Sequence, residues 1–131
     1  MDLGCAYCQR QTKGDLLFMT KQDKENLQNK KLTDSLLISC LAACETVISK
    51  KAYLEKKWSG YNVVFDQTAG DMYRQERLEW MGYREKLRSL LLPKYSMKLI
   101  IQMTKSCKDK ASQREVKEVI NLVEKNDYEL V

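Results

Sequence analysis

Apolar residues recur at three- and four-residue steps through the first half of the chain, at Leu37, Leu41, Cys44 and Ile48. This spacing is typical of the buried stripe of an amphipathic helix. Polar residues suited to cap a helix start lie directly before the stripe. The pattern therefore predicts a helix over residues 33–57.

Three further helices are predicted in the second half of the chain. The first begins near Asp71 and ends before Pro93, the second covers 95–106, and the third begins at Ser112, which opens a capping box with Glu115. The apolar residues expected to face inward are Tyr73, Trp80, Leu87 and Leu91, then Leu99, Ile100 and Met103, and finally Val116, Val119, Ile120 and Val123.

The other segments give weaker patterns. Residues 1–20 are interpreted as irregular or as containing a short strand, and the polar run 21–31 as an exposed helix or a loop. Residues 61–65 are interpreted as a strand or as a connector packed on the core. We therefore expect a mainly α fold in a single domain, 1–131. It would be a small bundle of about four helices with a short irregular N-terminal region.

Composition narrows the class of function. The chain of 131 residues has no histidine, which excludes Ser-His and Cys-His nucleophile systems, and it has no glycine-rich phosphate loop. We therefore expect a protein that is not an enzyme. No apolar run reaches the roughly 20 residues of a membrane span, and no secretory signal is found, so we expect a cytoplasmic or nuclear protein.

Four of the five cysteines form two close pairs, Cys5 with Cys8 and Cys40 with Cys44. Zinc binds thiolates in a tetrahedron, and it takes them from such pairs. The pattern predicts a zinc ion that pins the N-terminal region to the first long helix, so that residues 1–61 form a zinc-stabilised part and 62–131 a helical part. One alternative is that the four are independent thiols, with Cys40 and Cys44 buried as small apolar residues and Cys5 and Cys8 as surface thiols near the terminus. Another is that the first pair is a redox or acylated motif.

The segment 4–11, Gly-Cys-Ala-Tyr-Cys-Gln-Arg-Gln, resembles the first zinc knuckle of the small early oncoproteins of papillomaviruses. In that family a second CxxC pair follows at an interval similar to that between Cys8 and Cys40, and it leads into a helix with a serine-lysine step. The resemblance covers residues 4–61. The second pair here is CxxxC, and the family's second zinc module has no counterpart in 62–131. The resemblance implies a viral adaptor that captures helical peptides of host proteins.

Two clusters of basic residues suggest a different partner. The chain has a formal net charge of +5, from 23 Lys and Arg against 18 Asp and Glu. This excess indicates either a well-solvated surface or a functional basic face. The residues predicted to contact nucleic acid are Lys50, Lys51, Lys56 and Lys57, near Tyr53, Trp58 and Tyr61, together with Arg84 and Arg88. The alternative for Trp58 and Tyr61 is that they anchor the core.

The last residues, Leu130 and Val131, suit the groove of a PDZ-type partner, because an extended tail ending in valine can add a strand to a sheet edge. Taken together, the leading hypothesis is a regulatory adaptor that binds another protein through an apolar groove between helices. The alternative is a small basic RNA- or DNA-binding protein. Both are compatible with a homodimer.

Overall fold

The computed structural model describes residues 19–58 and 67–131 of the chain. Within these ranges the protein is mainly helical, which confirms the predicted fold class. The elements, in chain order, are α1 (Lys21–Gln28), β3 (Lys31–Leu32), α2 (Asp34–Trp58), α3 (Gln67–Leu91), α4 (Met97–Ser106), α5 (Gln113–Glu124) and β4 (Glu129–Leu130). None of the described helices combines the length and the apolarity that crossing a membrane requires.

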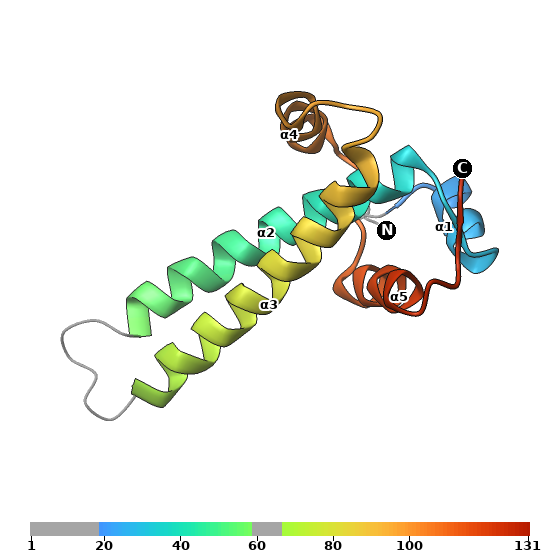
Figure 1. Ribbon diagram of the computed structural model, residues 1–131. Helices are drawn as coiled ribbons and strands as arrows, with labels where there is room; N and C mark the ends of the chain where they lie inside the picture. The colour runs from blue at the N-terminus through green and yellow to red at the C-terminus, as the bar shows by residue number, and fades with distance from the viewer. Residues whose placement is uncertain (1–18, 59–66) are drawn as a thin grey trace, which may run out of the picture.

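α2 and α3 form a long antiparallel hairpin, with 25 residues in each helix. At one end, which we call the base, the other elements surround the hairpin, and α4 and α5 lie on opposite sides of it (Figure 1). The rest of the hairpin, residues 50–58 and 67–79, extends away from α4 and α5 and is called the arm. The arm therefore offers helix surface that the rest of the described chain leaves uncovered.

The core lies in the base. Residues 36–44 of α2 are buried on every side of the helix, because neighbours pack around this segment from several directions. The fully buried partners from the other elements are Leu32, Leu87, Leu91, Ile100, Val116 and Val119. Burial of apolar side chains is the main favourable term in folding, so the base holds most of the stability and the arm is supported from it.

Local signals set several helix ends. The predicted capping box is confirmed: the Glu115 N–H donates to Ser112 Oγ at 3.1 Å, and the Ser112 N–H donates to Glu115 Oε1 at 2.8 Å. Thr20 and Ser96 cap α1 and α4 in the same way, by accepting a backbone N–H. These bonds satisfy donors that the first turn of a helix leaves without intrahelical partners.

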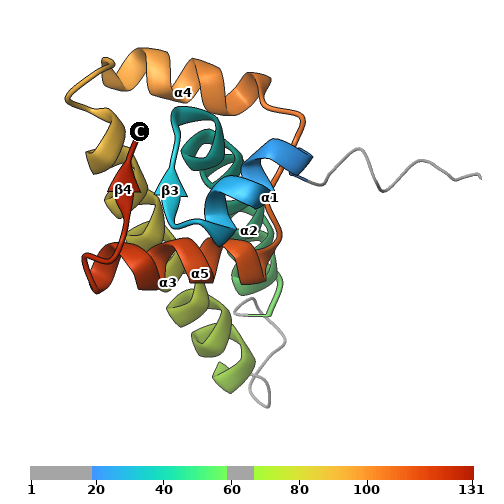
Figure 2. The ribbon, with the colours of Figure 1, turned by 90° about the vertical axis from the view of Figure 1, so that its right-hand side faces the viewer.

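The two short strands pair in parallel on the base (Figure 2). Lys31 is opposite Glu129, and Leu32 is opposite Leu130. The Glu129 N–H donates to the Lys30 carbonyl at 2.8 Å, and the Lys30 ammonium contacts Asp127 at 2.8 Å. A segment near the start of the described chain is thus joined to its end.

The structure differs from the sequence predictions at three points. The polar run 21–31 contains the helix α1, in which Asp23 and Leu27 are buried. α3 begins at Gln67, four residues before Asp71. The prediction that Leu99 faces inward is wrong: it is 40% exposed, because each residue of a helix turns about 100° and Ile100 takes the inner side. The proposed strand at 61–65 lies outside the described residues.

Candidate functional site

Three of the lysines that were predicted to contact nucleic acid lie on the outer side of the arm. Lys50, Lys56 and Lys57 are exposed on α2. Within residues 19–58 and 67–131, none of the three forms an ion pair. Lys50, Tyr53 and Lys57 follow at three- and four-residue steps, so they lie along one side of the helix. We call Lys50, Tyr53, Lys56 and Lys57 the lysine stripe.

Aromatic rings accompany these lysines. Tyr53 is 65% exposed, so its ring is available to a ligand. Trp58, at the end of α2, is half-buried, and the Lys57 ammonium lies 6.0 Å from the centre of its ring. Tyr61 lies outside the described residues. Of Tyr53 and Trp58, Tyr53 has the more exposed ring.

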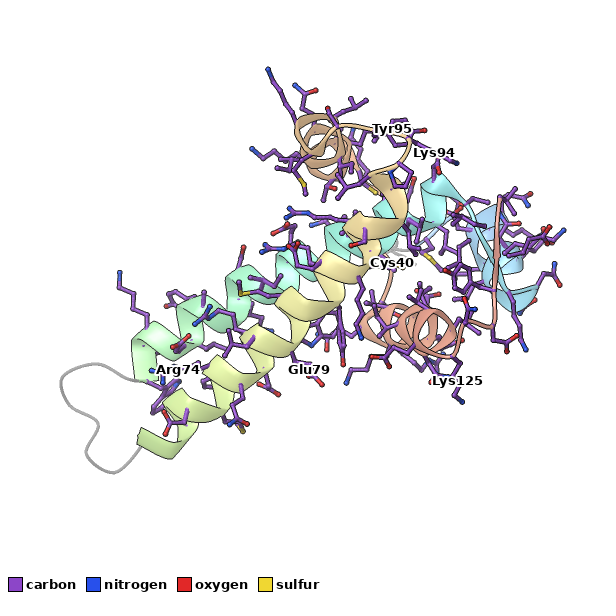
Figure 3. The ribbon with its side chains drawn as sticks, in the orientation of Figure 1. Cys40, Arg74, Glu79, Lys94, Tyr95 and Lys125 are labelled. Carbon is purple, nitrogen blue, oxygen red and sulfur yellow. The ribbon has the colours of Figure 1, made fainter. Side chains whose placement is uncertain are left out.

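Lys51 has a different environment. Its ammonium contacts Glu76 of α3 at 3.1 Å and lies 5.4 Å from the centre of the Tyr73 ring. Further along the seam between α2 and α3, Glu55 accepts hydrogen bonds from Arg74 and Arg77 (Figure 3). Lys51 therefore helps to hold the two helices of the arm together, which leaves it less free to contact a ligand.

Arg84 and Arg88 are mostly buried between α2 and α3. Arg88 donates to Glu45 at 3.0 Å and Arg84 to the same carboxylate at 3.4 Å, while Glu85 forms a further ion pair with each. The Nε atoms of both arginines are buried and have no hydrogen-bond partner within the described part of the chain. The two arginines therefore neutralise Glu45, while their Nε atoms are shielded from solvent.

A depression between α2 and α4 connects these arginines to the lysine stripe. It consists of two adjoining hollows of about 460 and 410 Å³. Both hollows are bordered by Glu45, Ser49, Thr104 and Lys105; the first adds Lys110 and the second adds Arg84 and Arg88. We call this depression the α2–α4 trough. Its border brings together four cations and one carboxylate, Glu45, which the arginines already hold.

Sequence reasoning missed Lys105 and Lys110, although a signal was present. Residues 94–110 contain five lysines and only one acidic residue, Asp109. That segment carries most of the net charge of +5. The signal is hidden because the predicted helix over 95–106 ends between the lysines and separates them into two elements. In the structure the Lys110 ammonium donates to Thr46 Oγ1 at 2.9 Å, which fixes it against α2.

A third hollow, of about 490 Å³, lies between the start of α2 and the end of α4. Ile38 and Met103 give it apolar walls. Its polar side is held by Asp23, a buried carboxylate that accepts hydrogen bonds from Ser35 at 3.0 Å and Ser39 at 3.5 Å. We call this hollow the Ile38–Met103 groove.

Cys40 and Cys44 lie in the core of the base, where both residues are fully buried. Cys40 is labelled in Figure 3. Burial raises the pKa of Cys44 to about 12, with the charge of Glu45 as a second cause, and burial also raises the pKa of Cys40. Both thiols are thus protonated at neutral pH. Cys5 and Cys8 lie outside the described residues, and no group of three or more potential metal ligands occurs among those described. The zinc site remains a prediction.

The C-terminal residues predicted to bind a partner belong to or follow β4. Leu130 and Val131 are 46% and 57% exposed, and the Val131 N–H donates to the Leu32 carbonyl at 3.1 Å. A PDZ-type partner would therefore compete with β3 for this backbone, and the proposed contact remains a prediction. No family model, curated protein sequence or solved structure matches the chain.

Proposed function

We propose that this chain is a small nucleic-acid-binding protein that holds a phosphate backbone along the lysine stripe and the α2–α4 trough. One observation carries the proposal. Lys50, Lys56 and Lys57 are exposed within a short length of α2 and form no ion pair within the described residues, and they surround the exposed ring of Tyr53. Lysines placed in this way neutralise phosphates and release the counterions that phosphates otherwise hold.

The trough extends the same charge toward α4. Ser49 borders both hollows and lies one helical turn before Tyr53, so the lysine stripe begins next to the trough on the same side of α2. Lys105 and Lys110 add two ammonium groups there. A polyanion that follows α2 would therefore meet cations over both the arm and the base.

The side of the hairpin that carries α5 lacks this excess of basic residues. α5 has three acidic residues, Glu115, Glu118 and Glu124, against two basic ones. α4, on the basic side, has lysines and no acidic residue. This difference favours attraction of a polyanion to the side of α2 that carries α4.

The proposal is tested by the salt dependence of binding. A fluorescein-labelled oligothymidylate is titrated with the protein between about 50 and 200 mM salt, where each phosphate contact to a single strand contributes about 0.7 to the slope of log affinity against log salt. Replacement of Lys50, Lys56 and Lys57 by Gln should weaken binding and reduce this slope by about 2.

The matched control replaces three exposed lysines elsewhere, Lys21, Lys117 and Lys125, by Gln. Lys125 lies at the end of α5, away from α4 (Figure 3). The control has the same net charge as the test variant, so it should keep most of the affinity. Equal losses in the two variants would show that binding depends on net charge alone, and no detectable binding would remove the proposal.

A second candidate function is supported by the Ile38–Met103 groove. Its apolar walls between two helices suit the apolar face of an amphipathic helix from a partner protein. Helical peptides selected from a displayed library should lose binding when Met103→Glu is introduced. They should keep it in Met72→Glu, which changes an exposed methionine of the arm. Peptides that bind both variants alike would exclude the groove.

A further inference from the structure

We infer that the ligand is an unpaired polynucleotide strand, that the α2–α4 trough receives one of its bases, and that the Tyr53 ring stacks on a neighbouring base. The inference rests on the proposed function, because it specifies which nucleic acid the basic surface takes. It follows from three features: the position of Tyr53, the lining of the trough and the concave shape of the site.

Tyr53 is placed to contact a base next to the trough. It lies one helical turn after Ser49, on the same side of α2, and Ser49 borders both hollows. Side chains of a helix tilt toward its N-terminus, so the tyrosine ring lies over the turn that contains Ser49. Every unpaired base offers a face for stacking on such a ring, whereas the bases of a duplex are already stacked on one another.

The trough combines apolar walls with polar groups at its border, as a nucleobase requires. Ala42 and Ile101 contribute apolar surface. Ser49 makes no side-chain hydrogen bond within the described part of the chain. The Thr46 hydroxyl donates to the Ala42 carbonyl at 3.1 Å, and it accepts from Lys110. Of the three donors of the Lys110 ammonium, this leaves two for a base edge or a phosphate.

The shape of the site disfavours a duplex. A protein helix usually reads duplex DNA by entering the major groove, and this requires a convex element. The first hollow lies between α2 and the end of α4, so this part of the surface is concave. A single strand can bend into the hollow and turn one base inward, which a paired strand cannot do without losing its pairing.

The test compares ligands of equal length: the single strands have equal numbers of phosphates and differ in their bases or sugars, and the duplex has about twice as many phosphates but no unpaired base. The probes are a fluorescein-labelled oligothymidylate, an abasic strand of the same length, a duplex of that length and an oligouridylate. The wild-type protein should bind the oligothymidylate more tightly than the duplex or the abasic strand. The oligouridylate shows whether the strand that is bound best is DNA or RNA.

Three variants locate the contact. Tyr53→Ala should weaken oligothymidylate binding about fivefold or more, the least expected from loss of one stacked base, with little change for the abasic strand. Tyr53→Phe, which keeps the ring, should restore most of the affinity. Ser49→Leu, which fills the hollow, should weaken binding of strands that carry bases and leave binding of the abasic strand unchanged. Both positions are exposed, and circular dichroism checks that the three variants fold.

The outcomes separate this inference from the proposed function. If the triple lysine variant weakens binding while Tyr53→Ala and Ser49→Leu act equally on the strands with and without bases, the basic surface binds phosphates only and the inference is wrong. A preference for the duplex would also overturn it. If wild-type binding is absent, or independent of salt, the proposed function itself fails.

Discussion

The carboxylate of Asp34 accepts a hydrogen bond from the hydroxyl of Tyr95, and this joins the first turn of α2 to the connection between α3 and α4. Lys94 donates to the same carboxylate at 3.0 Å. The hydrogen bond from Tyr95 is the main cause that lowers the pKa of Asp34, and Asp34 in turn raises the pKa of Tyr95. The two shifts act on stability at opposite ends of the pH range.

The lowered pKa of Asp34 predicts a loss of stability in acid. A carboxylate whose pKa is lower in the folded state stabilises the fold at neutral pH, and this contribution disappears as the pH falls through the folded-state value. Asp34→Asn should therefore unfold at lower urea than the wild type at pH 7, and the difference should shrink near pH 3. Asp71→Asn, which changes a largely exposed carboxylate of α3, is the control. A difference that stays constant with pH would contradict the prediction.

The raised pKa of Tyr95 predicts the reverse behaviour in base. A tyrosine with a raised pKa stabilises the fold while it is protonated, and this contribution is lost as the pH rises above its ordinary value of about 10. Tyr95→Phe should lower the urea midpoint at pH 7, and it should flatten the decline of stability above pH 10. Urea denaturation curves across this pH range measure the free energy of unfolding. An unchanged slope of this free energy against urea concentration shows that the variant has the same fold.

The ion pairs of Glu55 predict local behaviour of the arm. Arg77 and Arg74 both donate to its carboxylate, at 2.8 and 2.9 Å, and they lower its pKa. Glu55→Gln should speed amide hydrogen exchange in the arm, residues 50–58 and 67–79, while protection in the base stays unchanged. Glu118→Gln on α5 is the matched control. Faster exchange throughout the chain would show that the arm and the base open together.

The corrected position of Leu99 allows a matched comparison of two leucines. Leu91 is fully buried in the base, and Leu99 is 40% exposed on α4. Leu91→Ala should lower the free energy of unfolding by about 2–5 kcal/mol, because it removes buried apolar surface and leaves a cavity. Leu99→Ala should change it by about 0.5 kcal/mol or less. Chemical denaturation measures both, and similar losses would contradict the assigned burial.

The buried thiols predict slow chemical modification. Cys40 and Cys44 have raised pKa values and no access to solvent, so iodoacetamide at pH 8 should modify them only in denaturant. Cys107, which is half-buried, should react first among the described cysteines. Peptide mass spectrometry resolves the sites. If chelation of metal made Cys40 and Cys44 reactive in the native protein, the predicted zinc site would gain support.

The sequence predicted the helices whose signals are local. The capping box at Ser112 and the buried side of α5 were identified because hydrogen bonding and periodicity act within a few residues. For the segment of α1 the local pattern is compatible with either an exposed helix or a loop. Leu27 is the only apolar residue of α1. The burial of Leu27 depends on contacts with the core that no local pattern reveals.

The candidate site could be predicted only in part for the same reason. Lys50, Lys56 and Lys57 were recognised as a cluster, but the sequence did not show that Lys51 would turn toward Glu76. The trough depends on where α4 and the segment after it lie across α2, which brings Lys105 and Lys110 near Ser49 from about sixty residues away in the chain. This long-range placement follows from tertiary packing. The charge and spacing of residues within a short segment do not predict it.

The pairing of β3 with β4 has a kinetic consequence. Lys30 and Asp127, which meet beside the strands, are 97 residues apart, whereas the helical hairpin joins segments that are much closer in the chain. Contacts between distant segments form slowly, because closing a long loop costs entropy before any contact compensates for it. The hairpin of α2 and α3 should therefore form early during refolding. The pairing of β3 with β4, which places Leu32 opposite Leu130, should form in a late step.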